Sequence, residues 1–254
     1  MAKIKKTIII TGAAGKIGSA LATDLIKQGN KVLLGDVDKL RLLKIKKKLN
    51  SKNVHIFQAD LTTKSEIDKF IQCGLKKFKN IDSAVHCSYP RSKKYGAKFE
   101  DLEEANLKED LYYQLGSSII FSQRIIKYFL KKKKGNLILI SSIQGVQSPK
   151  FDHYKGSNMV SPIEYSAVKS GIIAITKYLS KYYRNKNIRI NCVSPGGVRD
   201  KKHSKLFINK YRQSCNSKGL LNGEDISKLI TFLLSDESRY IAGQNLIIDD
   251  GWSV

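Results

Sequence analysis

The stretch TIIITGAAGKIG at residues 7–18 decides the fold, because it joins a buried strand to a glycine-rich turn that opens a helix. The apolar, β-branched run at 7–10 is typical of a buried strand, and residues 17–28 form a helical pattern that ends at Gly29. A strand that turns directly into a helix predicts the first βα unit of a parallel sheet.

The same alternation continues to the end of the chain. Predicted strands lie at 7–10, 31–34, 54–58, 81–87, 137–141, 188–193 and 245–248, and predicted helices at 17–28, 40–49, 64–77, 109–130, 162–183 and 226–234. This order predicts an α/β fold over residues 1–254: one doubly wound parallel sheet with helices on both faces and no second domain.

The charge of the chain is unusual, at +24 from 46 basic and 22 acidic residues. An anionic partner is one interpretation, but the lysines are scattered along helices, which favours a solvated surface and no binding of nucleic acid. No apolar run approaches a membrane span, so we expect a cytoplasmic protein without a membrane partner. The four cysteines lack metal-ligand spacing, which predicts a reduced protein without a metal site.

The glycine-rich turn predicts a dinucleotide site. Glycines let the backbone approach a pyrophosphate closely, and the helix that follows directs N–H groups and a positive dipole at it. The alternative is a tight turn without a ligand, but the strand–turn–helix context favours binding. The residues predicted to bind the cofactor here are Thr11, Gly12, Gly15, Lys16, Ile17 and Gly18.

Asp36 ends the second predicted strand, 18 residues after Gly18. A carboxylate there accepts hydrogen bonds from an adenosine ribose and repels a 2′-phosphate, so it favours NAD, with NADP still open because Lys16 and Lys39 are nearby cations. The alternative is that Asp36 is only a turn residue. Asp60, after the third strand, either caps the next helix or contacts the adenine end of the cofactor.

Tyr165 and Lys169 are four residues apart on a predicted helix, so they share one face. A free tyrosine is a poor base at neutral pH, and a nearby ammonium group lowers its pKa. Ser142 follows the fifth strand and can hydrogen-bond a substrate oxygen. The three residues together predict proton transfer to or from a carbonyl or alcohol.

With these motifs the chain resembles the short-chain dehydrogenase/reductase family over nearly its full length. The matching segments are 11–18, 142–145, 165–170, 191–198 and 243–252. The resemblance implies a Rossmann-type domain in which Ser142 polarises the substrate oxygen, Tyr165 transfers the proton and Lys169 binds the nicotinamide ribose. It also implies cofactor contacts by Asp60, Leu61, Cys87, Ser88, Tyr165, Lys169, Pro195, Gly196 and Val198, and a homo-oligomer (dimer or tetramer).

Several positions depart from the family pattern. The second glycine of the loop comes one place early, and His86-Cys87-Ser88-Tyr89 replaces the usual Asn-Asn-Ala-Gly. The asparagine that completes a catalytic tetrad aligns with Gln114, which we therefore include among the predicted catalytic residues. These changes leave a cofactor-binding scaffold without activity as an alternative.

The interval between Ser142 and Tyr165 is about ten residues longer than usual for the family. We expect three loops on the substrate side, at 88–100, 146–161 and 199–222, the last as a mobile lid. The first two are similar to those of the flagellin-modification protein A-like reductases, a subgroup associated with bacterial nonulosonic (sialic-acid-like) sugars. Arg91, Lys93 and Tyr154 are then the predicted substrate residues, with a solvated loop as the alternative for the two cations.

The sequence therefore predicts an NAD(P)-dependent oxidoreductase that transfers hydride to or from a carbonyl or alcohol. The favoured small-molecule substrate is a sugar or nucleotide-activated amino sugar of surface-glycan or flagellin-glycan biosynthesis. A 3-oxoacyl thioester is the alternative substrate. His153 is interpreted as a hydrogen-bonding loop residue without a catalytic role.

Overall fold

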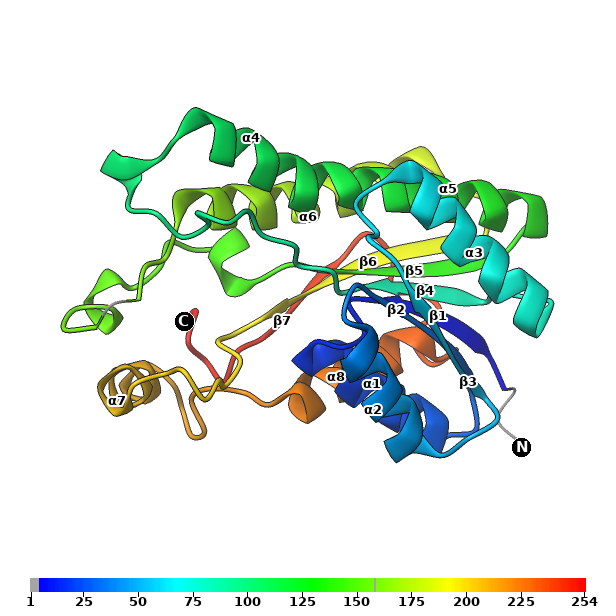
Figure 1. Cartoon of the computed structure of the whole chain (residues 1–254), viewed down its shortest axis with the longest axis horizontal. Helices are drawn as coiled ribbons and strands as arrows, with labels where there is room; N and C mark the ends of the chain where they lie inside the picture. The colour runs from blue at the N-terminus through cyan, green and yellow to red at the C-terminus, as the bar shows by residue number, and fades with distance from the viewer. Residues whose placement is uncertain (1–4, 158) are drawn as a thin grey trace.

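The computed structural model describes residues 5–157 and 159–254 and contains one sheet of seven parallel strands in the order β3-β2-β1-β4-β5-β6-β7 (Figure 1). The strands are β1 (Thr7–Thr11), β2 (Lys31–Asp36), β3 (Val54–Gln58), β4 (Ser83–His86), β5 (Gly135–Ile140), β6 (Ile188–Pro195) and β7 (Asn245–Ile248). The predicted doubly wound parallel sheet is confirmed. The strand order reverses between β1 and β4, and that point opens a crevice at the carboxyl ends of the strands.

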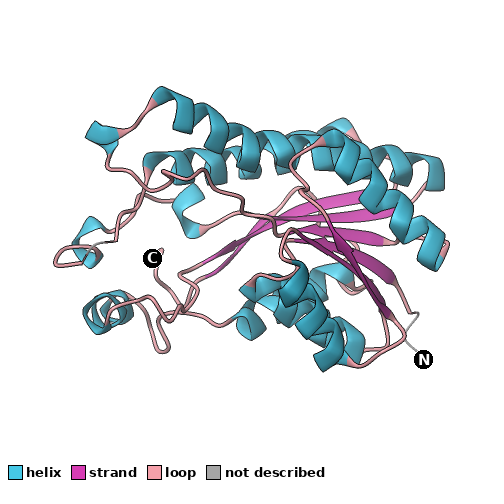
Figure 2. Cartoon of the chain, viewed as in Figure 1, coloured by secondary structure: helices cyan, strands magenta, loops and turns pink. Residues whose placement is uncertain are grey.

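Helices cover both faces of the sheet (Figures 1 and 2). One face carries α1 (Lys16–Lys27), α2 (Lys39–Leu49) and α8 (Gly223–Leu234), and the other carries α3 (Lys64–Phe78), α4 (Glu104–Leu111), α5 (Ser117–Lys132) and α6 (Ile163–Tyr182). Strand β1 contributes side chains to the hydrophobic cores on both faces of the sheet. Ile9 packs on the α3, α5 and α6 side, while Ile8 and Ile10 pack on the α1 and α8 side. Burial on both faces explains the continuous apolar run in the sequence.

The structure differs from the sequence prediction around the long helix expected at 109–130. The helical segment begins earlier, at α4, and a π-helical turn at Tyr112–Gly116 separates α4 from α5. A π turn adds one residue to a helical turn, and such turns recur at functional sites. Gln114 lies within this turn, so the inserted residue affects how a predicted catalytic side chain is presented.

The segment expected as a mobile lid at 199–222 contains helix α7 (Lys205–Gln213), which the sequence prediction missed. Two of its side chains, Phe207 and Tyr211, are buried and pack with Ile143 and Trp252. A short helix of this kind depends on tertiary contacts that local sequence does not contain. It lies beyond the carboxyl ends of the strands, beside the site described below (Figure 1).

Removing the ring of Phe70 is expected to destabilise the fold by about 3–5 kcal/mol, because it is fully buried between α3 and the sheet. Urea denaturation of Phe70→Ala measures this loss. Phe99→Ala is the matched control, since that ring is 73% exposed and its loss is expected to change stability by at most about 0.5 kcal/mol. Equal losses in the two variants would contradict the assignment of Phe70 to the core.

Candidate active site

A pocket of about 450 Å³ lies at the carboxyl ends of the central strands. Cys87 and Ser88 reach it from the end of β4, Ser142 from the end of β5, and Tyr165 and Lys169 from α6. The segment after β6 completes it, with Pro195, Gly196, Gly197 and Val198 among the lining residues. Residues separated by more than 100 positions in the chain thus meet at one edge of the sheet.

Close packing fixes the predicted catalytic residues relative to one another. The short helix after Ser142 (Ile143–Gly145) lies directly on α6, where a Cβ on Gly145 would come within 2.6 Å of the Lys169 backbone. The Ser141 hydroxyl donates to the Lys169 carbonyl at 2.8 Å. Only glycine permits this approach, so β5 and α6 hold Ser142 and Tyr165 at a fixed separation.

The Lys169 ammonium lies in a buried position next to Tyr165. It donates to the Ile140 carbonyl at 3.0 Å, and its Nζ atom is 5.4 Å from the centroid of the Tyr165 ring. Burial disfavours the charged form and lowers the Lys169 pKa to about 8. The ammonium group therefore remains mostly charged at neutral pH, although its pKa is only slightly above that pH.

The pKa of Tyr165 is raised by burial, and a hydrogen bond with Ser142 opposes that effect only in part. The sequence predicted that Lys169 lowers the pKa of Tyr165, and in the structure without a bound cofactor that pKa is raised. Desolvation of the phenolate is the largest cause, and Tyr154 raises the pKa further. Tyr165 is consequently a phenol at neutral pH, ready to donate its proton.

The glycine loop is shaped for close backbone approach. Gly12 has φ +61°, and a Cβ there would come within 2.5 Å of the Cys87 carbonyl oxygen. A Cβ on Gly18 would come within 2.6 Å of the Gly12 carbonyl oxygen. Gly15 is the N-cap of α1 and provides no capping side chain, so first-turn N–H groups remain available for a pyrophosphate. The loop therefore fits a dinucleotide.

Asp36 supports the loop from the end of β2. Its carboxylate accepts hydrogen bonds from the Ala14 amide at 2.9 Å and the Asp38 amide at 3.0 Å, one on each oxygen. The turn role considered from sequence is thus present in the structure. Each oxygen keeps a second lone pair for a ribose hydroxyl, so the role in cofactor choice stays a prediction.

Lys16 makes a contact that the sequence did not predict. Its ammonium pairs with Asp200 at 2.5 Å and also donates to the Arg199 carbonyl, linking α1 to the 199–222 segment. The hydrogen bond from Lys16 is the largest cause that lowers the Asp200 pKa, to about 2. Lys16 therefore connects the cofactor loop to the expected lid.

Asp60 and Leu61, which follow β3, do not line this pocket. The other predicted cofactor residues outside its lining are Thr11, Gly12, Gly15, Lys16, Gly18 and Asp36. Asp60 accepts hydrogen bonds from the amide and hydroxyl of Thr62, at 3.1 and 2.8 Å. Leu61 is buried in the core that packs against α3. The expectation that Asp60 caps α3 is wrong, because Thr63 is the N-cap and accepts a hydrogen bond from the Glu66 amide. Contacts of Asp60 or Leu61 with a cofactor remain predictions.

The 88–100 segment presents an aromatic platform to the pocket. Tyr89 packs edge-on against Tyr165 at 5.5 Å and is hydrogen-bonded to Tyr95. The Arg91 guanidinium lies 5.5 and 5.8 Å from the Tyr89 and Tyr95 ring centroids and makes no ion pair within the described residues. Lys93 is exposed and does not line the pocket, so the structure brings only Arg91 of the two predicted cations to the site.

The 146–161 segment, of which residue 158 lies outside the described part, brings Tyr154 to the pocket as predicted. Its hydroxyl accepts a hydrogen bond from the Gln144 side chain at 3.2 Å. His153 is buried and hydrogen-bonds Ser214 at 3.0 Å, in agreement with a structural role. Sequence reasoning missed lining residues that only long-range packing identifies, namely Tyr89, Tyr95, Gln144, Phe207, Tyr211 and Trp252.

Comparisons with known proteins agree with this geometry. The family profile described as enoyl-(acyl carrier protein) reductase matches residues 12–253. The chain belongs to the short-chain dehydrogenase/reductase family. It is 37% identical over 253 residues to the post-translational flagellin modification protein A of Campylobacter coli, covering 98% of both chains.

Other members of this oxidoreductase family that resemble the chain are named for other activities. The 3-oxoacyl-[acyl-carrier-protein] reductase FabG of Thermotoga maritima is 28% identical, with 97% of both chains covered. A short-chain dehydrogenase from Leptospira borgpetersenii, solved with bound NAD+, superposes with a TM-score of 0.86 at 29% identity, covering 100% of this chain and 94% of the other. These comparisons show the fold and the enzyme class, whereas the relatives differ in the substrates that their names give.

Against the family pattern, Gln114 and His86 are the departures with structural consequences. The Gln114 side chain is buried, and neither its nitrogen nor its oxygen has a partner among the described residues. His86 bonds the Thr11 hydroxyl through Nδ1 at 2.8 Å, while its Nε2 lacks a described partner and burial lowers its pKa to about 3. Buried polar groups of this kind commonly bind internal water.

No helix in residues 5–157 or 159–254 has the length and apolarity needed to span a membrane. The proton-relay role of Gln114 stays a prediction, because this residue does not line the pocket.

Lys169 is expected to titrate near pH 8 in the cofactor-free protein, well below the ordinary lysine value of 10.5, because burial penalises its charged form. Nuclear magnetic resonance of ¹³C-labelled lysine side chains measures the midpoint. The low-pH titration should vanish in Lys169→Met and persist in Lys177→Met, which alters an exposed lysine on the same helix. A protein whose lysines all titrate above pH 10 would contradict this assignment.

Proposed function

We propose that this oxidoreductase uses NAD to transfer hydride to or from the carbonyl or alcohol carbon of a nucleotide-activated amino sugar. The observation that carries the proposal is that Ser142, Tyr165 and Lys169 line one pocket together with Ile17, which follows the glycine loop. The similarity to a flagellin modification protein supports a role in bacterial surface-glycan or flagellin-glycan biosynthesis. Whether NADP also serves is left open by Lys16.

The chain's own residues handle the substrate oxygen and its proton. The Ser142 hydroxyl lines the same pocket as Tyr165 and orients the substrate oxygen next to the phenol. During reduction Tyr165 donates its proton to that oxygen, and during oxidation it accepts one. The Lys169 charge stabilises the phenolate that donation leaves behind. A bound nicotinamide supplies the hydride chemistry.

Arg91 supports an anionic substrate. Its guanidinium is held on two tyrosine rings at the pocket, and no carboxylate among the described residues neutralises it. The loop that carries it is anchored, because the Ser92 amide and hydroxyl both bond the buried Asp110 carboxylate at 2.7 Å. A preorganised guanidinium is well suited to bind two phosphate oxygens at once.

A 3-oxoacyl thioester remains the second candidate substrate, because an apolar groove of about 440 Å³ adjoins the pocket. Phe99, Phe151 and Ile163 line it, and it shares Tyr154 and Ser161 with the catalytic pocket. An acyl chain would bury this surface, and the similarity to a 3-oxoacyl reductase agrees with that use. A cytoplasmic location and a dimeric or tetrameric assembly stay predictions.

Tyr165→Phe is expected to lower turnover by roughly 10²- to 10⁴-fold, because it removes the proton donor and leaves the pocket's shape unchanged. The absorbance of reduced nicotinamide, followed with a panel of nucleotide-activated amino sugars and with each cofactor, measures the rate. Cofactor affinity should be unchanged, which separates loss of chemistry from loss of binding. Full turnover in the variant would refute the assignment of Tyr165 as proton donor.

Arg91→Ala is expected to reduce kcat/KM for a phosphorylated substrate by roughly ten- to a hundredfold, through loss of charge-assisted hydrogen bonds. Lys93→Ala removes the same charge from the same loop outside the pocket, and should change kcat/KM by no more than about twofold. A phosphate-free carbonyl substrate should respond little to either variant. Equal effects of the two substitutions would show that only net charge matters.

A further inference from the structure

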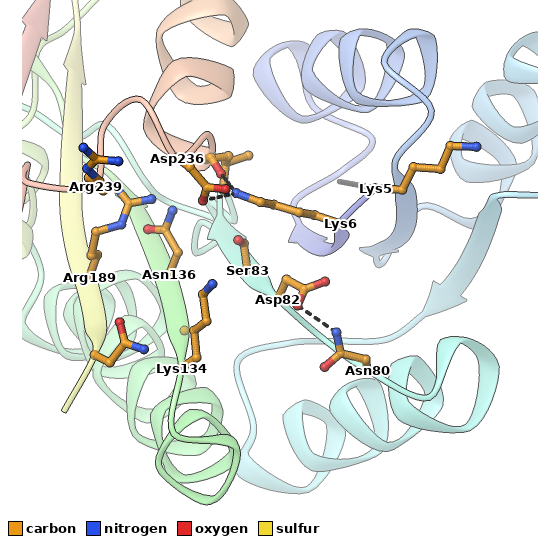
Figure 3. A pocket seen from close by; sticks show the side chains of 13 residues that line it. Lys5, Lys6, Asn80, Asp82, Ser83, Lys134, Asn136, Arg189, Asp236 and Arg239 are labelled. Atoms are coloured by element: carbon orange, nitrogen blue, oxygen red, sulfur yellow. Dashed lines mark hydrogen bonds and ion pairs between the residues drawn. The ribbon is translucent and has the colours of Figure 1, made fainter. Parts of the chain in front are cut away.

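A second hollow, of about 560 Å³, lies at the amino ends of the central strands (Figure 3). Ser83 at the start of β4, Asn136 in β5 and Arg189 in β6 contribute to it, together with residues of the α8–β7 connection. The catalytic pocket is at the opposite edge, and β5 alone, with six residues, separates the edges by roughly 20 Å. The proposed hydride transfer makes no use of this hollow.

The two acidic residues of the hollow are already compensated. Asp236 pairs with Lys6 at 2.8 Å. Asp82 pairs with Lys132 at 2.5 Å and accepts a hydrogen bond from the Thr7 amide at 2.8 Å. The pKa of Asp236 is lowered first by its hydrogen bond with Lys6, and the charges of Lys134 and Arg189 lower it further.

The remaining basic residues differ in how they are used. Arg189 donates to the backbone carbonyls of Leu233, Ser235 and Ser238, which is a structural role. The charged groups of Lys134 and Arg239 have no hydrogen bond or ion pair within residues 5–157 and 159–254. Figure 3 shows Lys134 pointing toward the space beside Asn136 and Ser83. Five basic and two acidic residues line the hollow, which therefore carries excess positive charge. The Arg239 guanidinium also lies 5.0 Å from the centroid of the Tyr240 ring.

Asn136 adds a requirement that charge alone does not. Its side-chain nitrogen donates to the Leu233 carbonyl at 2.8 Å, which fixes the orientation of the amide. The side-chain oxygen has no donor among the described residues, although Asn136 is only 5% exposed. An acceptor in this state favours a ligand that brings its own O–H or N–H group.

We propose that this hollow is a binding site for a phosphorylated small molecule that carries hydroxyl groups. The phosphate oxygens would lie against Lys134 and Arg239, and a hydroxyl would donate to the Asn136 oxygen. A carboxylate or sulfate matches the cations but offers no donor. The volume exceeds that of inorganic phosphate and falls within the range of small-molecule sites, so a sugar phosphate or a nucleotide is the fitting class.

A titration followed by backbone amide shifts tests the location and the need for a donor. Inorganic phosphate at low ionic strength should cause saturable shifts at Ser83, Gly135 and Asn136. Sulfate should bind several-fold more weakly, because phosphate near neutral pH carries an O–H group and sulfate does not. Equal affinities, or saturable shifts confined to the glycine loop at 12–18, would overturn the proposal.

Matched variants separate this site from general attraction to a +24 chain. Lys134→Ala should weaken phosphate binding by about tenfold, whereas Lys131→Ala, an exposed lysine of α5 outside the hollow, should leave it unchanged. Equal losses would overturn the site. A hexose phosphate and a nucleoside monophosphate identify the ligand class, because the proposal requires that at least one bind at 83 and 135–136 more tightly than inorganic phosphate.

Discussion

The pairing of β1 with both β2 and β4 is the constraint on which the rest of the structure depends. The backbone of β1 bonds a neighbour on each side, and the chain leaves the sheet in opposite directions from the two neighbours. The helices that follow β1 and β4 lie on opposite faces of the sheet, so a crevice opens between the two connections. The close approach of Gly12 to Cys87 is a direct result, because these residues follow β1 and β4. The turn that would hold a dinucleotide is thus placed by strand pairing.

Chemistry at this edge depends on a buried charge whose partners are few. Lys169 has a carbonyl acceptor from β5 and two tyrosine rings nearby, and burial brings its pKa close to neutral. The same burial raises the pKa of Tyr165. In the protein alone both groups favour their protonated forms near neutral pH. Before reactants bind, Tyr165 therefore carries the proton that it would donate, and bound reactants change its pKa further.

The two edges of the sheet have different electrostatic character. At the carboxyl edge, the guanidinium of Arg91 is held on aromatic rings next to the catalytic residues. At the amino edge, Lys134 and Arg239 surround a hollow in which Asn136 holds an unpaired acceptor. A net charge of +24 is consistent with a solvated lysine surface over most of the molecule. At these two places, however, neighbouring side chains place the basic groups beside a pocket.

The sequence by itself determined the fold class and the glycine loop, and it predicted that Tyr165 and Lys169 share one helix face, because strand–helix alternation and spacing along one helix are local patterns. Tertiary structure alone decided which distant side chains meet. It buried α7 through Phe207 and Tyr211, and brought Arg91 to the pocket while Lys93 stayed outside. It also set the pKa of Tyr165, since burial is a property of the whole packed chain and no local pattern encodes it.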